Sequence, residues 1–307
     1  MIIILLFTAF HFTFTFDSFV TFRHGDDEAG IYASPILNMK ARFNNVRLYS
    51  TGGYTYYNYK EQEEKKWKLF QFYGKLYFKR FELKGGKLVY IPGFPSLFNP
   101  LSRKNMFNTI ATHLEGDWGG FLRYSSSNFT SNIFIYRNKN NWNEEAEIQL
   151  DYGRFLLGLY GRNEKEFKKG IFGAYIGPWT VRLSFFREDD NNTLHGMVEK
   201  NIVGTIASLH FLHANHKFLI HLPGGIFQSD FITAVEFTFP QKVFEIPYVL
   251  LIHDVTNKNT IMLYDIKIIL RDYLKIEAGA TLYTKPQPSG TVYILSLIHI
   301  SEPTRRS

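Results

Sequence analysis

The chain has 307 residues, of which 45% are hydrophobic and 17% aromatic, and its formal net charge is +7. After the first sixteen residues no apolar run approaches the roughly 18 to 20 residues that a membrane-spanning helix needs, which excludes a helical membrane protein. The chain has no cysteine, and no compact basic cluster indicates a nucleic-acid partner.

The N-terminal block has two competing interpretations. Residues 1–7 read MIIILLF, which is typical of the hydrophobic region of a secretory signal. Residues 10–16 read FHFTFTF, and this alternation is typical of a strand. No Lys or Arg precedes the block, and no small-x-small cleavage site follows it. Because of its position, we expect residues 1–16 to be an export signal, with a first strand as the alternative.

The region from residue 17 to residue 294 is built from short segments that alternate apolar and polar residues. In residues 37–43 one face carries Leu, Met, Ala and Phe, whereas the other face carries Asn38, Lys40 and Arg42. The same period recurs at 69–79, 147–152, 181–185, 235–239, 264–270 and 274–282. Only helices and closed barrels satisfy the backbone in lipid. The pattern therefore predicts an all-β fold, a transmembrane antiparallel β-barrel of about 16 strands.

Polar and aromatic residues mark where these strands should end. Turns are expected at Asn44-Asn45, at Lys84-Gly85-Gly86 and at residues 189–192. The polar stretches 60–68 and 138–145 are expected to be long outer loops. Aromatic residues near strand ends predict two interfacial girdles, made of Tyr54, Tyr56, Tyr57, Trp67, Trp118, Trp142, Tyr152 and Trp179. The alternative is cross-strand packing in a soluble β-sandwich.

The least strand-like segment is residues 86–120, GKLVYIPGFPSLFNPLSRKNMFNTIATHLEGDWGG. It resembles a stretch of porin-like outer-membrane β-barrel proteins in which a strand leads into a glycine, an Asn-Pro turn and an inserted loop. The corresponding residues are Gly93, Asn99 and Pro100. The resemblance covers this segment only. It implies that residues 96–113 fold inward and narrow a pore, with Arg103 and Lys104 as charged contributors; the alternative is an ordinary surface loop.

Basic residues on the expected water-facing sides of the strands are the candidate pore lining. They are Lys40, Arg42, Lys75, Lys79, Arg123 and Arg182, in addition to Arg103 and Lys104. Such residues favour anions. Acidic residues occupy similar faces, at Glu147, Asp151, Glu236, Asp265 and Glu277, so selectivity depends on which charges share a height in the barrel. Four histidines between residues 210 and 221 lack metal-ligand spacing, and no catalytic motif appears.

The C-terminal residues require a separate interpretation. Residues 295–305 read LSLIHISEPTR, which resembles the translation of a sequencing adapter read through in frame. The resemblance implies that residues 295–307 are a non-native tail and that the barrel of residues 17–294 is incomplete at its C-terminus. The alternative is a native polar tail.

These patterns together predict a porin of the bacterial outer membrane that lets small polar or anionic solutes diffuse through a water-filled lumen. Expected partners are outer-membrane lipid and small solutes or ions, with a homotrimer as a further option and no nucleic acid. We expect no enzymatic activity and no cofactor. The alternatives are a non-channel structural or adhesive barrel and a secreted soluble β-sandwich binding protein, with an outer-membrane enzyme as the weakest.

Overall fold

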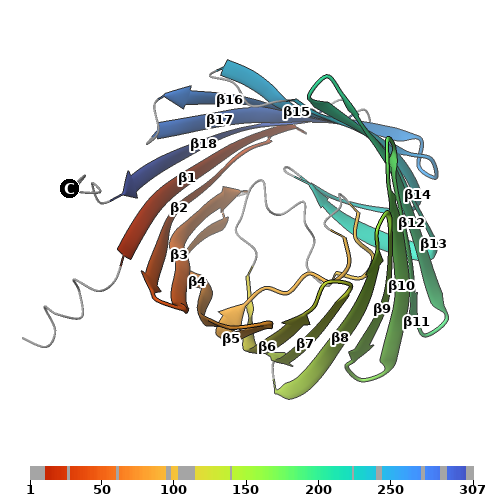
Figure 1. Cartoon of the computed structure of the whole chain (residues 1–307). Coiled ribbons are helices and arrows are strands. Elements are labelled where there is room, and N and C mark those ends of the chain that lie inside the picture. Colours follow the sequence, from red (N-terminus) through yellow and green to blue (C-terminus); the bar gives the residue numbers. More distant parts are fainter. Residues whose placement is uncertain are drawn as a thin grey trace, which may run out of the picture.

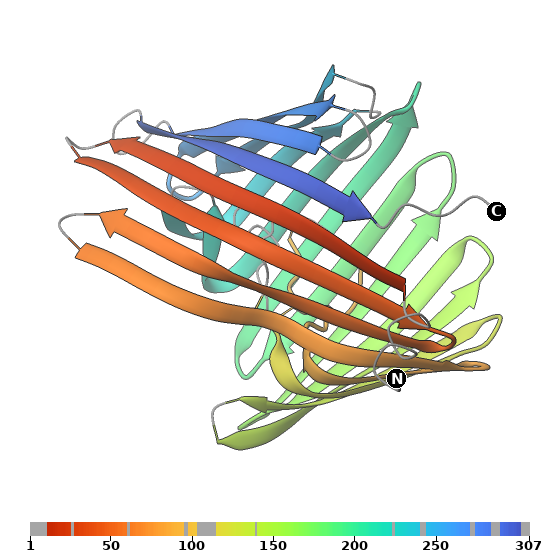
Figure 2. The ribbon, with the colours of Figure 1, turned by 90° about the vertical axis from the view of Figure 1, so that its left-hand side faces the viewer.

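The computed structural model of the chain contains one antiparallel sheet that closes on itself (Figure 1). The structure describes residues 11–25, 28–59, 62–94, 98–102, 115–138, 140–222, 225–239, 244–270, 274–283 and 289–301. Each strand pairs with its neighbours along the chain, and β1 pairs with β18 to complete the ring. Figure 2 shows these two strands side by side. The expected all-β transmembrane barrel fold is confirmed, and the described residues form eighteen strands where about 16 were expected.

The strands follow one another in a simple up-and-down order. They are β1 (His11–Gly25), β2 (Glu28–Phe43), β3 (Val46–Tyr59), β4 (Gln62–Phe78), β5 (Phe81–Leu88), β6 (Asp117–Ser125), β7 (Phe129–Asn138), β8 (Asn141–Tyr152), β9 (Phe155–Asn163), β10 (Phe167–Ile176), β11 (Thr180–Glu188), β12 (Asn191–Ile202), β13 (Thr205–Leu222), β14 (Gly225–Thr238), β15 (Phe244–Asp254), β16 (Asn259–Leu270), β17 (Leu274–Tyr283) and β18 (Ser289–Ser301).

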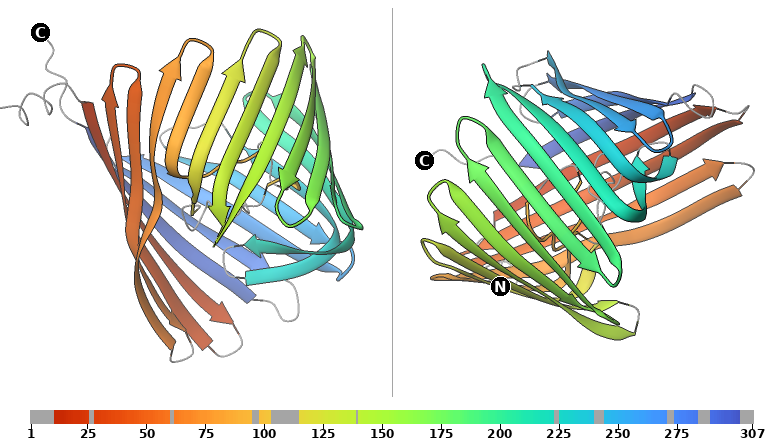
Figure 3. Two further views of the ribbon diagram at one scale, coloured as in Figure 1. Left: turned by 90° about the horizontal axis from the view of Figure 1, so that it is seen from below. Right: turned by 90° about the vertical axis from the view of Figure 1, so that its right-hand side faces the viewer.

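The two faces of the sheet differ as a membrane barrel requires. On β7 and β8 the outward side chains Ile133, Ile135 and Leu150 are 43%, 43% and 54% exposed, whereas the inward Phe134 and Glu147 are buried. Figure 3 shows a single wall of strands. Among the described residues no second layer covers the outward apolar side chains, so the soluble β-sandwich alternative does not fit. No helix in the described chain has the length and apolarity to cross a bilayer.

The aromatic residues near strand ends lie at both rims of the barrel. Trp67, Trp118 and Trp142 are exposed on the outer face near the rim where the connection between β5 and β6 begins. Tyr152 and Trp179 are exposed at the opposite rim, at the ends of β8 and of the turn after β10. This distribution agrees with the expected pair of girdles.

Two predicted turns are correct and one is wrong. The chain reverses at Asn44–Asn45 and at Asp189–Asp190, as expected. The reversal expected at Lys84-Gly85-Gly86 occurs instead at Lys79–Arg80, and β5 runs through the two glycines. Gly86 has a φ of 131°, and a Cβ there would lie 2.3 Å from the carbonyl oxygen of Phe72. Glycine is therefore required at this position for close strand approach and not for a turn.

The two long outer loops expected from polar composition are also corrected. Residues 62–68 belong to β4, and residues 141–145 belong to β8. In β8 the polar side chains Asn143 and Glu145 are buried on the inner face. Polar residues in a barrel wall face the lumen, so polarity at these positions does not mark a loop.

The predicted ends of the barrel overlap with strands. Residues 11–16 of the expected export signal lie in β1, and residues 295–301 of the expected foreign tail lie in β18. Residues 1–10 and 302–307 lie outside the described chain. Signal cleavage and the origin of the tail are properties of the gene and its processing, so both boundaries stay predictions.

The adjacent glycines of β5 give a matched test of close strand approach. We expect Gly86→Ala to destabilise the barrel by about 1–3 kcal/mol, because the new Cβ would collide with the backbone of β4. Gly85→Ala should stay within about 0.5 kcal/mol of the parent, since no atom lies within 4 Å of its Cβ position. Urea unfolding in lipid vesicles measures the free energy of unfolding of each variant. Equal values for Gly86→Ala and Gly85→Ala would contradict this account.

Candidate functional site: the barrel lumen

The connection between β5 and β6 is called the inserted segment below, and its described residues lie inside the ring of strands (Figure 1). Of the residues 96–113 that were expected to fold inward, the structure describes 98–102. Its described parts are residues 89–94, 98–102 and 115–116. Pro92 and Pro100 cannot donate to a strand ladder, so the chain leaves the wall here. Figure 1 shows the described part inside the ring of strands. Tyr90, Phe98 and Leu101 are all buried against inner-wall side chains.

A buried carboxylate on β8 anchors the beginning of the inserted segment. Glu147 is 1% exposed, and its Oε2 accepts hydrogen bonds from the Tyr90 hydroxyl at 2.7 Å and from the Gly93 backbone N–H at 3.0 Å. Gln149 also donates to this carboxylate. Burial, and then the negative charge of Glu147, raise the pKa of Tyr90, so its hydroxyl stays protonated and available as a donor.

The middle of the inserted segment is folded onto itself by an asparagine. The side-chain amide of Asn99 donates to the carbonyl oxygens of Pro92 at 2.7 Å and Phe94 at 3.2 Å, and its Oδ1 accepts from the Leu101 N–H at 3.1 Å. Gly93 has a φ of 69°, and a Cβ there would lie 2.7 Å from the Leu101 side chain. These contacts hold residues 92–94 and 98–101 together in a compact unit, which is called the plug below.

The far end of the plug reaches a different part of the wall. Phe98 packs into an apolar cluster on the inner faces of four consecutive strands, β13 to β16, made of Leu212, Ile232, Ala234, Leu250, Ile252, Ile261 and Leu263. Leu101 instead packs with aromatic side chains of β6 to β11, including Phe134 and Phe172. The inserted segment therefore contacts strands on both sides of the lumen and narrows the passage.

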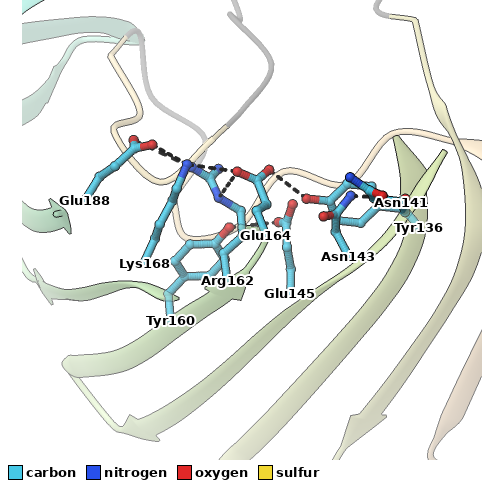
Figure 4. A network of polar contacts seen from close by, with 9 residues as sticks. All are labelled: Tyr136, Asn141, Asn143, Glu145, Tyr160, Arg162, Glu164, Lys168 and Glu188. Atoms are coloured by element: carbon cyan, nitrogen blue, oxygen red, sulfur yellow. Dashed lines mark hydrogen bonds and ion pairs between the residues drawn. The ribbon is translucent and has the colours of Figure 1, made fainter. Parts of the chain in front are cut away.

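Ion pairs and hydrogen bonds link the polar side chains of the inner wall next to the plug (Figure 4). Glu164 accepts from the Tyr136 hydroxyl at 2.9 Å and from Lys168 at 2.8 Å, and Lys168 also pairs with Glu188. Glu145 accepts a hydrogen bond from Tyr160 at 2.8 Å. Ion pairs therefore balance Glu164, Lys168 and Glu188, whereas Glu145 is held by a hydrogen bond from a neutral hydroxyl.

The wall formed by β2 to β5 carries a continuous row of cations. Arg42 lies opposite Arg47, Arg47 opposite Lys75, and Lys75 opposite Lys84. We call these four residues the basic row. Like charges directly opposite each other destabilise a sheet, so the row costs stability and indicates a functional role.

A single carboxylate contacts the basic row among the described residues. Glu82 pairs with Lys75 at 2.8 Å and with Lys84 at 3.0 Å. The ring of Tyr77 lies 5.1 Å from the Arg47 guanidinium and 4.5 Å from the Lys75 ammonium. One carboxylate cannot balance four cations, so this wall presents positive charge to the lumen.

The structure brings several of the predicted lining residues together. Lys40, Arg42, Lys75 and Arg123 lie on β2, β4 and β6, on the inner face of one continuous stretch of wall. Arg123 donates to Asn132 at 2.9 Å. Lys40 lies opposite Tyr49 on β3, next to the pair of Arg42 and Arg47 and on the same face of the sheet.

The other predicted lining residues lie elsewhere. Arg182 is on β11, where it pairs with Glu199 at 3.6 Å. Lys79 lies in the turn after β4 with a φ of 50°, so it is at the rim and not on the wall. Arg103 and Lys104 lie outside the described residues. In the described chain no three His, Cys, Asp or Glu side chains gather to hold a metal ion.

Several lumen residues were missed from the sequence. Arg47 follows the same alternation as Lys40 and Arg42 and could have been found, whereas Lys84 was hidden by its assignment to a turn. Glu147 was noted only as a lumen charge. Its partners Tyr90 and Gly93 are 57 and 54 positions away, so no local signal marks it as an anchor.

Comparisons with solved structures agree with this architecture. A BenF-like porin from Pseudomonas fluorescens Pf-5 has a TM-score of 0.69 at 11% identity, with 96% of this chain and 99% of that chain covered. OccK2 (OpdF) from Pseudomonas aeruginosa, solved in complex with glucuronate, has a TM-score of 0.66 at 13% identity, with 96% and 98% covered. The fold is that of the porins.

The likeness extends to the outer membrane protein OprD from Pseudomonas aeruginosa, with a TM-score of 0.63 at 9% identity and 96% and 94% of the two chains covered. No protein family profile and no curated protein sequence matches the chain. The porin fold is therefore shared without recognisable sequence similarity, and the assignment of function depends on the lumen itself.

The anchoring role of Glu147 gives a direct test. Glu147→Ala removes the acceptor of two buried donors, which costs about 1–3 kcal/mol per unsatisfied group and releases the start of the plug. We expect single-channel conductance in planar bilayers to rise about twofold, with more frequent fluctuations. Asp151→Ala, on the same strand and exposed, is the control and should behave as the parent. Unchanged conductance in Glu147→Ala would show that the anchor does not set the pore.

Proposed function

We propose that the protein is a passive channel of the bacterial outer membrane for small polar solutes, with a preference for anions. The observation that carries the proposal is the basic row on the inner wall of a closed ring of strands. Solutes cross down their own gradients, and the plug and the wall charges set the rate. The outward apolar face and the aromatic residues at both rims support a place in a membrane.

The lumen is asymmetric in charge, and this supports selectivity. Cations of the basic row line β2 to β5, whereas apolar side chains covered by Phe98 line β13 to β16. A passing anion would replace part of its water with contacts to Arg47, Lys75 and Tyr77 on the open wall. A cation would meet repulsion at the same height, with Glu82 already held by two lysines.

The proposal includes no catalytic step and no cofactor. Its partners are membrane lipid and small polar solutes or ions. OccK2, which shares the fold, has been solved with glucuronate, an example of a small polar anion in such a barrel. A homotrimer, the export signal of residues 1–16 and the foreign tail of residues 295–307 stay predictions from the sequence.

The second candidate function is a structural or adhesive barrel that carries no current. It is favoured by the inserted segment, which fills part of the lumen. We expect the purified protein to give stepwise ion currents in planar bilayers, since Arg42 of the basic row is exposed on the inner wall. A protein that inserts into the bilayer, with heat-modifiable migration on gels, but carries no current would be a structural or adhesive barrel.

Charge reversal in the basic row tests the preference for anions. We expect Arg42→Glu together with Arg47→Glu to lower the anion-to-cation permeability ratio about threefold or more, measured from reversal potentials in a salt gradient. Arg187→Glu is the control, because Arg187 is exposed and lies opposite Lys169 on the outer face. An equal shift in both variants, or no shift in the double variant, would overturn the role of the row.

A further inference from the structure

Two histidines on neighbouring strands lie beneath the tip of the plug. His195 of β12 and His210 of β13 are each 1% exposed, and their rings stack with centroids 5.9 Å apart. The ring of Phe98 meets both rings edge-on, at 6.2 Å and 6.0 Å. The plug therefore ends on a histidine pair, which it shields from the water of the lumen.

The histidine pair is incompletely hydrogen-bonded. Nε2 of His210 lies 3.0 Å from Oε2 of Glu236 on β14. Nε2 of His195 and Nδ1 of His210 are buried without a hydrogen-bond partner among the described residues. Buried polar groups without partners are costly, and native structures keep few of them without a functional reason.

The charged groups around the pair can balance one proton and not two. On β14 Glu236 faces His210, and on β12 Glu199 is paired with Arg182 of β11 at 3.6 Å. Phe98 from the plug and the cross-strand partners of the two histidines carry no charge; these partners are Ser184, Met197, Leu212 and Ala234. Glu236 can offset a proton on His210. A second proton, on His195, would lie near two positive charges, those of Arg182 and of protonated His210, and would have no carboxylate of its own.

We propose that Phe98 and this histidine pair form an acid-sensitive latch that holds the plug across the lumen. At neutral pH Phe98 stays seated on the two rings, and Glu236 is the carboxylate that faces the pair. In acid the second imidazole gains a proton, and a buried charge without a partner requires water. Departure of Phe98, which packs edge-on against both buried rings, admits this water from the lumen. The stability of the seated plug is thus present at neutral pH and lost as pH falls.

The consequence is a pore that opens further in acid. The current measurements that test this inference rest on the proposed channel function. The movement of Phe98 can be tested without any current. Other carboxylates of the lumen also titrate in acid, so the test compares variants at the same pH. His213 lies on β13 with His210 but is exposed on the outer face, against Phe231, and it supplies a matched control.

The first arm measures conductance at about pH 7.5 and about pH 4.5, on either side of the usual histidine pKa of about 6.5. We expect the parent and His213→Gln to gain about twofold in acid, and His195→Gln to show no gain. His195→Gln keeps the pair between His210 and Glu236 intact. Phe98→Ala should already conduct at the acid level at neutral pH. A parent that conducts without the gain in acid, or His195→Gln that shows the gain, would overturn the latch.

The second arm is independent of current. Para-fluorophenylalanine at position 98, in lipid nanodiscs, reports water contact through the solvent isotope shift of its fluorine resonance. We expect a buried signal at neutral pH and a hydrated one in acid, with the change absent in His195→Gln. A conducting barrel whose fluorine stays buried in acid would refute the latch alone, whereas a fluorine that moves in a barrel without current would refute only the channel.

Discussion

Closure of the backbone hydrogen-bond ring is the constraint on which the rest of the structure depends. Unpaired backbone amides in lipid cost several kcal/mol each, and the pairing of β1 with β18 removes the last free edge of the sheet. Once the ring is closed, every residue faces either lipid or the lumen. The outer face can then be uniformly apolar, and polar residues such as Glu147, His195 and Arg47 collect inside.

The lumen is divided by the plug into two environments. On the side of β6 to β16 the described part of the inserted segment completes a core of its own, with Leu101 among aromatic rings and Phe98 among aliphatic side chains. On the side of β2 to β5 the basic row remains in contact with the passage. The same segment thus packs against the wall from within, with anchors at Glu147 and at the histidine pair, and in the proposed function it leaves one charged wall for solutes.

Sequence periodicity was sufficient for the fold class because strand alternation is local. Residues 37–43 show their two faces within seven positions, and the turns at Asn44–Asn45 and Asp189–Asp190 follow from local turn chemistry. Gly85–Gly86 is a misleading turn signal, since glycine serves close strand approach as well as turns. A turn placed at these glycines puts Lys79 on the wall and Lys84 off it, whereas the structure has the reverse. The basic row and the histidine pair depend on cross-strand register, which couples residues such as Arg47 and Lys75 that no local pattern connects.

The central claim is that alternate residues of each strand face lipid and an enclosed, water-accessible lumen. A nitroxide scan of β10 in lipid vesicles tests it most directly, using oxygen to report lipid contact. The account predicts high oxygen accessibility at Phe167, Lys169 and Ile171, which face outward, and low accessibility at Lys168, Gly170 and Phe172 between them. Uniform accessibility along the strand, or maxima at the second set, would contradict the barrel as described.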